Sequence, residues 1–168
     1  MFDPSSPYSS SKASAELICN SYAKTFGTKL TISRCTNNFG TWQMTEKLIP
    51  TVISKALANE KIPVYGDGKQ RRFWIYVDEH NKAIMDILHH GQLDATYNIS
   101  PKYEWNNSPV NGNLMYNIDI IKMILKHLEK PESLISYVTD RAAHDRCYFL
   151  IADKLKKECG YQDTSDFN

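Results

Sequence analysis

The sequence LTISRC at residues 30–35 alternates apolar and polar side chains, which is typical of a β-strand with one buried face. A strand followed by a helix predicts an α/β unit, in which helices cover a parallel sheet. The helix is predicted over residues 46–59, where apolar residues recur at helical spacing: Leu48, Ile49, Val52, Ile53, Ala56 and Leu57.

The same alternation continues along the rest of the chain and predicts an α/β fold with a mostly parallel sheet. In such folds, ligands usually bind beyond the carboxyl ends of the strands. The segment from Ser100 to Asn117 is rich in Asn, Pro and Gly and predicts a functional or mobile loop. Further strands are expected at 62–65, 73–77, 96–99 and 135–139. Helices are expected from Pro7, after Ser5 and Ser6, from Asp78 to His89 or His90, from Asn117 to Leu128, and at 152–159. Asp78 and Asn117 are expected to cap the helices that they begin.

Composition excludes several classes of function. A chain of 168 residues with 42% hydrophobic and 23% charged residues fits one domain of a soluble protein. The net charge of +1 gives no general attraction to nucleic acid or to a membrane, so a small molecule is the expected partner. No apolar run is long enough to span a membrane and the N-terminus lacks a signal peptide, which predicts the cytosol. The four cysteines lack metal-ligand spacing and predict reduced, mostly buried thiols.

Tyr8 and Lys12 are four residues apart, so a helix would place a phenol and an ammonium on one face. A neighbouring cation favours the phenolate and lowers a pKa that is about 10 in a free phenol, which lets a tyrosine accept a hydroxyl proton. This spacing is also expected about once by chance in the chain. Tyr65 and Lys69 repeat it across a GDG turn that would keep them off a common helical face. Spacing alone leaves catalysis and coincidence both open.

Arginines in the loops after strands suggest a diphosphate ligand, because the planar guanidinium fork matches phosphate oxygens. The candidates are Arg72, Arg141 and Arg146, with Lys47 as an additional point charge. His144 lies in the most charged loop and suits a ligand contact, a proton carrier, or an exposed position with neither role.

Amides and aromatic residues in these loops each allow two interpretations. Asn37 and Asn38 follow a strand and suit either sugar hydroxyls or ordinary turn chemistry. Tyr65 suits stacking on a flat base or packing within its strand. Trp42 is the tryptophan best placed to line a site, whereas Trp74 and Trp105 suit packing. The seven glycines form no glycine-rich motif after a strand, so the chain encodes no pyrophosphate cradle for a dinucleotide.

Taken in order, a set of motifs resembles the second half of an extended short-chain dehydrogenase, most closely the dTDP-glucose 4,6-dehydratases of deoxysugar and rhamnose synthesis. The resemblance covers nearly the whole chain. The motifs are SPYSSSKAS (6–14), NNFG (37–40), EKLIP (46–50), PVYG (63–66), YNI (97–99), DR (140–141), HDR (144–146) and Tyr148.

The resemblance implies the C-terminal part of an NAD(P)-binding Rossmann-like fold and its smaller substrate-binding α/β portion. Residues 1–40 would end the Rossmann-like domain and residues 41–168 would form mainly the nucleotide-sugar-binding portion. It also implies recycled NAD, dTDP-glucose or UDP-glucose as substrate, a 4-keto-6-deoxy sugar nucleotide as product, and a homodimer in the intact enzyme. The N-terminal cofactor half would be missing, so we expect a fragment that is cut at both ends, inactive alone, with apolar surface exposed on its first helix.

The resemblance assigns roles to individual residues and implies no metal. Tyr8 would be the base at the sugar 4-hydroxyl, and Lys12 would hold the nicotinamide ribose and tune Tyr8. Both would line the NAD site together with Asn38. The nucleotide-sugar contacts would be Asn37, Lys47, Leu48, Pro63, Val64, Tyr65, Arg72, Asn117, Asp140, Arg141 and His144.

The chain departs from the family pattern at four places, which leaves the substrate open. Ser100-Pro101 replaces a glycine pair, Phe73 an acidic or amide residue, Ala142-Ala143 a Pro-Gly pair, and Trp42-Gln43 an aromatic-His pair that borders the sugar. The alternatives are a UDP-sugar epimerase or decarboxylase of the same superfamily, or a noncatalytic module that binds sugar nucleotides.

Overall fold

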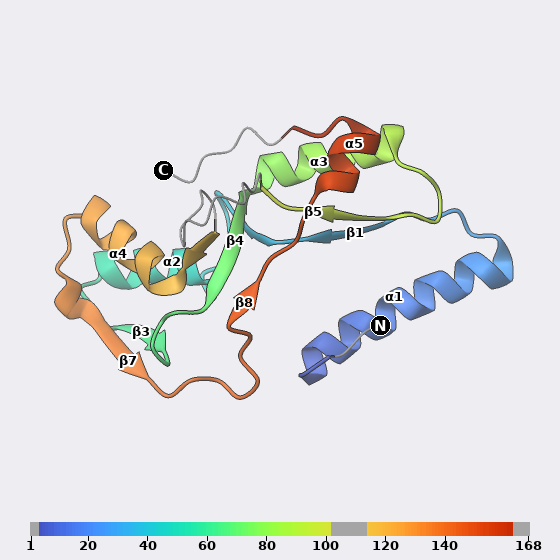
Figure 1. Ribbon diagram of the computed structural model, residues 1–168. Coiled ribbons are helices and arrows are strands. Elements are labelled where there is room, and N and C mark those ends of the chain that lie inside the picture. The colour runs from blue at the N-terminus through green and yellow to red at the C-terminus, as the bar shows by residue number, and fades with distance from the viewer. Residues whose placement is uncertain (1–3, 102–113, 163–168) are drawn as a thin grey trace.

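Residues 4–101 and 114–162 are described by the computed structural model, and they form layers of helices packed on mainly parallel strand pairs (Figure 1). Most of the predicted loop between Ser100 and Asn117, and the packing expected for Trp105, lie outside these residues. Within them the helices are α1 (Pro7–Phe26), α2 (Leu48–Leu57), α3 (Val77–His90), α4 (Asn117–His127), the 3₁₀ helix η1 (Glu132–Leu134) and α5 (Asp153–Cys159).

Parallel pairing connects strands that are distant in sequence, as the alternation of strands and helices predicts. Only Thr36 separates the first two strands, so the chain passes directly from one sheet into the next. The parallel pairs are β1 (Ile32–Cys35) with β5 (Thr96–Ile99), β2 (Asn37–Phe39) with β4 (Arg71–Tyr76), β3 (Ile62–Tyr65) with β7 (Ile135–Val138), and β4 with β8 (Cys147–Tyr148). Strand β4 also pairs with β6 (Leu114–Tyr116), in the antiparallel direction.

The sequence signals at the start of α1 are confirmed. The Ser6 hydroxyl accepts a hydrogen bond from the Ser9 amide at 3.2 Å, and Pro7 occupies the first turn, where its missing amide proton costs nothing. The helix ends at Gly27, whose left-handed φ of 65° favours glycine. As expected, apolar surface is exposed on this helix, which buries none of its residues and leaves Leu17, Ile18, Tyr22 and Phe26 each more than half exposed.

The predicted caps of two later helices are wrong. Helix α3 begins at Val77 and its N-cap is Tyr76, so Asp78 lies in the first turn, where its charge still favours the helix dipole. Helix α4 includes Asn117 as its first residue and is likewise capped without a side-chain hydrogen bond. The short strands β2, β6 and β8 were not expected either, because two or three residues carry no readable alternation.

Buried apolar side chains form two main clusters on either side of β4. One joins α3, β5 and α5 through residues such as Ile87, Tyr97 and Leu155. The other joins α2, β3 and α4 through residues such as Val52 and Leu125. The cluster of α2, β3 and α4 matters for function, because these elements hold one wall of the cavity described below.

The expectation of mostly buried thiols holds for only part of the set. All four cysteines are free, but Cys19 and Cys147 are exposed, Cys35 is half-buried and Cys159 is buried. In residues 4–101 and 114–162, no cluster of three or more His, Cys, Asp or Glu side chains could hold a metal ion. No helix in the same ranges combines the length and the apolar character needed to cross a membrane.

Truncation of Leu125 tests the second cluster. This side chain is fully buried, so Leu125→Ala should lower the free energy of unfolding by about 2–5 kcal/mol through lost burial and a residual cavity. Leu88→Ala is the matched control, because Leu88 is 72% exposed and should cost less than about 1 kcal/mol. Urea unfolding measures both, and equal losses in the two variants would contradict the assigned core.

Candidate functional site

A cavity of about 820 Å³ lies between β3, the start of α2 and the loop after β7, within the size range of small-molecule sites. It brings together twelve of the residues selected from the sequence, although they come from seven different segments. Lys12 and Asp140 are outside the lining. The twelve are Tyr8, Asn37, Asn38, Lys47, Leu48, Pro63, Val64, Tyr65, Arg72, Asn117, Arg141 and His144.

The first turns of α1 place Tyr8 and Lys12 on one face, as their spacing predicts. The Lys12 ammonium lies 5.6 Å from the centre of the Tyr8 ring. Burial raises the pKa of the nearby Cys35 thiol, and the charge of Lys12 opposes part of that shift. The Tyr148 hydroxyl is 3.5 Å from the Cys35 carbonyl oxygen, and its pKa is raised by burial and then by Cys35 and Tyr8. The pair therefore lies near the carboxyl end of β1.

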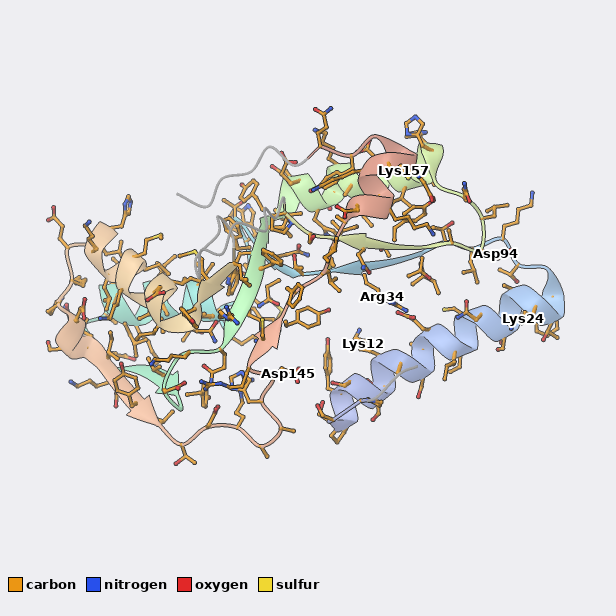
Figure 2. All side chains as sticks on the ribbon, viewed as in Figure 1. Lys12, Lys24, Arg34, Asp94, Asp145 and Lys157 are labelled. Carbon is orange, nitrogen blue, oxygen red and sulfur yellow. The ribbon has the colours of Figure 1, made fainter. Side chains whose placement is uncertain are left out.

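An ion pair fixes α1 against β1. The Arg34 fork donates from Nε and Nη2 to the two carboxylate oxygens of Glu16, at 2.6 and 2.5 Å. This hydrogen bond from Arg34 lowers the pKa of Glu16. Figure 2 shows Arg34 extending from β1 toward α1, and Lys12 on the side of the helix that faces the strands. Arg34 thus sets the position of the helix that carries Tyr8.

Asn37 and Asn38 lie in strand β2, in register with Trp74 and Ile75 of β4, so they are not turn residues. The Asn38 Nδ2 group lies 3.2 Å from His80 Nδ1 and 3.9 Å from Cys35 Sγ. Asn38 Oδ1 is buried and has no hydrogen-bond partner among the described residues. A buried acceptor without a donor is costly, so this oxygen is suited to a ligand.

Arg72 contributes a half-buried guanidinium to the cavity wall. It donates to the backbone oxygens of Arg71 and Asp145 at 2.8 and 2.7 Å, and burial lowers its pKa. Both of these partners are neutral carbonyl groups, and the charge of Asp145 opposes part of the lowering of the Arg72 pKa. An anionic ligand would find a pre-oriented cation here.

The loop after β7 forms a hydrogen-bonded network at the cavity wall. Asp140 Oδ1 is 2.7 Å from His144 Nδ1, and this hydrogen bond is the main cause that lowers the pKa of Asp140. His144 Nε2 lies 3.2 Å from Arg141 Nη2, and the Arg141 guanidinium lies 5.0 Å from the centre of the Tyr65 ring. Gln70 Nε2 donates to Asp140 Oδ2 at 3.0 Å. Asp140 therefore supports the lining residues without lining the cavity itself.

The turn between β3 and β4 explains why Tyr65 and Lys69 share no helical face. Gly66 and Gly68 have φ values of 59° and 71°, which glycine adopts without strain. A Cβ atom at Gly66 would lie 2.8 Å from Asp140 Oδ2, so the turn and the loop after β7 approach closely. Tyr65 remains 41% exposed beneath Arg141 rather than packed in a core, which leaves its ring available to a ligand.

Two positively charged candidates have partners of their own. Arg146 forms a bidentate ion pair with Asp67 at 2.7 and 3.0 Å and does not line the cavity, so it does not join Arg72 and Arg141 in a cluster of three. Lys47 lines the cavity at the N-cap of α2 and lies 3.0 Å from Glu46.

Several lining residues were missed by the sequence reasoning. Gln43, Glu46, Thr51 and Gln70 all belong to the cavity wall. Trp42, which was expected to line a site, is fully exposed and is not among the lining residues. Its left-handed φ of 65° is the reason, because this backbone turn directs the neighbouring Gln43 to the cavity instead. The departure from the family motif at Trp42-Gln43 was the sequence signal that could have identified Gln43. That signal did not show which residue of the pair lines the cavity.

The fold matches the C-terminal portion of Rossmann-like extended short-chain dehydrogenases. A family model described as GDP-mannose 4,6 dehydratase matches residues 1–168, and the chain belongs to this family.

Individual relatives show which members of the family this chain is similar to. The chain is 41% identical over 175 residues to a dTDP-glucose 4,6-dehydratase of Xanthomonas campestris pv. campestris (strain B100), covering 99% of this chain and 47% of the relative. An Escherichia coli dTDP-glucose 4,6-dehydratase is 37% identical over 167 residues, with 99% and 45% covered. The chain therefore spans about half the length of the curated relatives it matches.

Solved structures agree with this pattern. DesIV, a dTDP-glucose 4,6-dehydratase from Streptomyces venezuelae crystallised with NAD, has a TM-score of 0.90 and 32% identity, covering 99% of this chain and 49% of that protein. A UDP-glucuronic acid 4-epimerase from Bacillus cereus has a TM-score of 0.87 at 22% identity, with 99% and 50% covered, which shows a shared fold alone.

Removal of the ion pair tests whether it positions α1. Glu16→Gln should increase amide hydrogen exchange in residues 7–26 by roughly 2–10-fold, because the Arg34 fork loses its charged partner. The exchanged pair, Glu16→Arg with Arg34→Glu, should protect the helix better than either single variant does. Mass spectrometry measures the exchange, and an unchanged rate in Glu16→Gln would contradict this role.

The pH dependence of stability tests the contact between His80 and Asn38. Burial lowers the pKa of His80 below its ordinary 6.5, so the unfolded chain binds a proton at higher pH than the folded chain does. The stability advantage of the wild type over His80→Gln should therefore shrink as pH falls from 7 through 6.5 to the lower folded pKa. Urea unfolding from pH 8 to 5 measures it, with the exposed His90→Gln as control. An advantage that stays constant with pH would refute the expectation.

Proposed function

We propose that this chain provides the nucleotide-sugar site and the catalytic tyrosine of an NAD-dependent nucleotide-sugar 4,6-dehydratase. The substrate is dTDP-glucose or UDP-glucose, and the product is the 4-keto-6-deoxy sugar nucleotide. The observation that carries the proposal is the single cavity lined by twelve residues selected from sequence motifs. The similarity to relatives named dTDP-glucose 4,6-dehydratase supports the choice of reaction.

The residues near the carboxyl end of β1 fit the nicotinamide end of NAD. Lys12 supplies a cation for ribose hydroxyls, and the unpaired Asn38 Oδ1 supplies an acceptor. The chain contains no glycine-rich cradle for the pyrophosphate, so it fits only this end of the cofactor. When bound, NAD would take hydride from C4 of the sugar and return it to C6 after water is lost across C5 and C6.

Tyr8 is the proposed base at the sugar 4-hydroxyl. Its phenol takes the hydroxyl proton as C4 is oxidised, and the neighbouring Lys12 ammonium stabilises the phenolate form. Tyr8 lines the cavity while Lys12 is not among the lining residues, which supports a division between proton transfer and electrostatic support. Asn37, beside Asn38 in β2, binds the sugar.

The other end of the cavity binds the nucleotide. Arg72 and Arg141 hold the diphosphate, since both line the cavity and carry guanidinium forks. Tyr65 stacks on the base, supported by its exposed ring. Asp140 and His144 orient Arg141 through their hydrogen bonds. The remaining contacts come from the cavity-wall residues Lys47, Leu48, Pro63, Val64 and Asn117.

The proposed division of labour places residues 1–40 with the cofactor domain and residues 41–168 mainly with the nucleotide sugar. Its support is that Tyr8, Lys12 and Asn38 precede residue 41, whereas the proposed diphosphate and base contacts follow it. We further propose that the intact enzyme is a cytoplasmic homodimer, as in the family it resembles. The exposed apolar residues of α1 offer surface for such contacts.

Product formation tests the function. This chain, together with the sequence that completes the length of its relatives, should convert dTDP-glucose or UDP-glucose to a 4-keto product with NAD. Tyr8→Phe should lower turnover by about 10²–10⁴-fold, because it removes the group that takes the proton. Tyr137→Phe is the control, since this exposed tyrosine of β7 is not among the lining residues. No 4-keto product, or full turnover in Tyr8→Phe, would refute the proposal.

A further inference from the structure

Gln43 is directed into the cavity by an unusual turn between β2 and α2. The backbone amide of Gln43 donates to the Gly40 carbonyl oxygen at 3.4 Å, and the preceding Trp42 has a left-handed φ of 65°. Trp42 consequently points into solvent and is fully exposed, whereas Gln43 is half-buried and lines the cavity. A strained backbone at a cavity edge is a common sign of a functional constraint.

Hydrogen bonding fixes which end of the Gln43 amide is available. Its Nε2 group donates to the Asn38 carbonyl oxygen at 2.8 Å. Its Oε1 atom is buried and has no hydrogen-bond partner in the described part of the chain. Because Gln43 lines the cavity, a hydroxyl group of a ligand in the cavity can supply the missing donor. Gln43 is therefore an acceptor that lacks a donor.

The polarity of this part of the wall restricts the ligand. Asn38 Oδ1 is a second buried acceptor without a partner among the described residues. Glu46 and Lys47 also line the cavity, and their charged groups pair at 3.0 Å. The guanidinium groups come from other elements, with Arg72 on β4 and Arg141 in the loop after β7. Amide oxygens accept hydrogen bonds from hydroxyl groups, whereas a carboxylate has no proton to donate to them.

We propose that Gln43 binds a ring hydroxyl of the sugar and so selects a neutral nucleotide hexose over a nucleotide hexuronate. The inference rests on the proposed function and adds a specificity-determining residue to it. The missing donor of Gln43 Oε1 is a sugar hydroxyl, and the loss of that hydrogen bond weakens binding of the sugar without affecting the nucleoside diphosphate.

Calorimetry on this chain separates the sugar contact from the nucleotide contact. The ligands are dTDP, dTDP-glucose, UDP-glucose and UDP-glucuronate. The wild type should bind UDP-glucose about tenfold or more tightly than UDP-glucuronate, because the acceptor wall rejects a carboxylate. Gln43→Met keeps the side-chain length but removes both polar groups. It should weaken the affinity for dTDP-glucose by roughly 5–30-fold and change the affinity for dTDP by less than about twofold.

Two further variants sharpen the test. Gln43→His should retain most of the affinity for dTDP-glucose, because one ring nitrogen can donate to the Asn38 carbonyl oxygen while the other accepts from the sugar. Gln92→Met is the matched control, since Gln92 is exposed and is not among the lining residues, and it should change no affinity.

The outcomes distinguish this inference from the proposed function. Equal binding of UDP-glucose and UDP-glucuronate by the wild type would overturn the inference without the need for any variant. An equal loss of affinity for dTDP and dTDP-glucose in Gln43→Met, or no loss for either, would also overturn the inference, while binding of dTDP by the wild type would still support the proposed function. If the wild type binds none of the four ligands, the proposed function fails and the inference fails with it.

Discussion

The ion pair between Arg34 and Glu16 determines where the chemistry of this chain lies. Helix α1 buries no residue of its own, so ordinary core packing does not hold it in place. The Arg34 fork instead joins the helix to β1, whose last residue adjoins the Asn37–Asn38 segment through Thr36. Tyr8 thereby lines a cavity whose other walls come from distant parts of the sequence. A planar bidentate contact suits this task, because it fixes orientation as well as distance.

Local signals predicted the elements that form from local interactions. The cap at Ser6 and the turn at Gly66–Gly68 depend on nearby residues and were foreseen. The strand at Ile62–Tyr65 was also foreseen, although it pairs with the distant strand β7. Strand β2 was not foreseen, because its three residues are extended mainly by pairing with β4. The caps expected from Asp78 and Asn117 failed for a related reason. Both side chains lie one or two residues inside helices that begin directly at the end of a strand.

The sequence predicted which residues belong to the site better than it predicted how they are arranged. Motif order selected twelve of the lining residues, whereas the reasoning from loop arginines treated Arg146 like Arg72 and Arg141. Only the fold shows that Asp67, 79 positions earlier, pairs with Arg146. Gln43 and Gln70 were overlooked because glutamine carries no charge or periodicity that marks it in a sequence. Their importance depends on buried hydrogen bonds, one to the Asn38 carbonyl oxygen and one to Asp140.

The close approach of Gly66 to Asp140 has a consequence for how the site can vary. A methyl group at position 66 would lie within 2.8 Å of an Asp140 carboxylate oxygen and would displace it. Asp140 holds His144, and His144 adjoins Arg141, so the displacement would be transmitted to the nucleotide end of the cavity. Substitution of Gly66 is therefore constrained by the carboxylate of Asp140, which is 74 positions away in the sequence. The two segments should be inherited as a coupled unit, even though Gly66 itself is not among the lining residues.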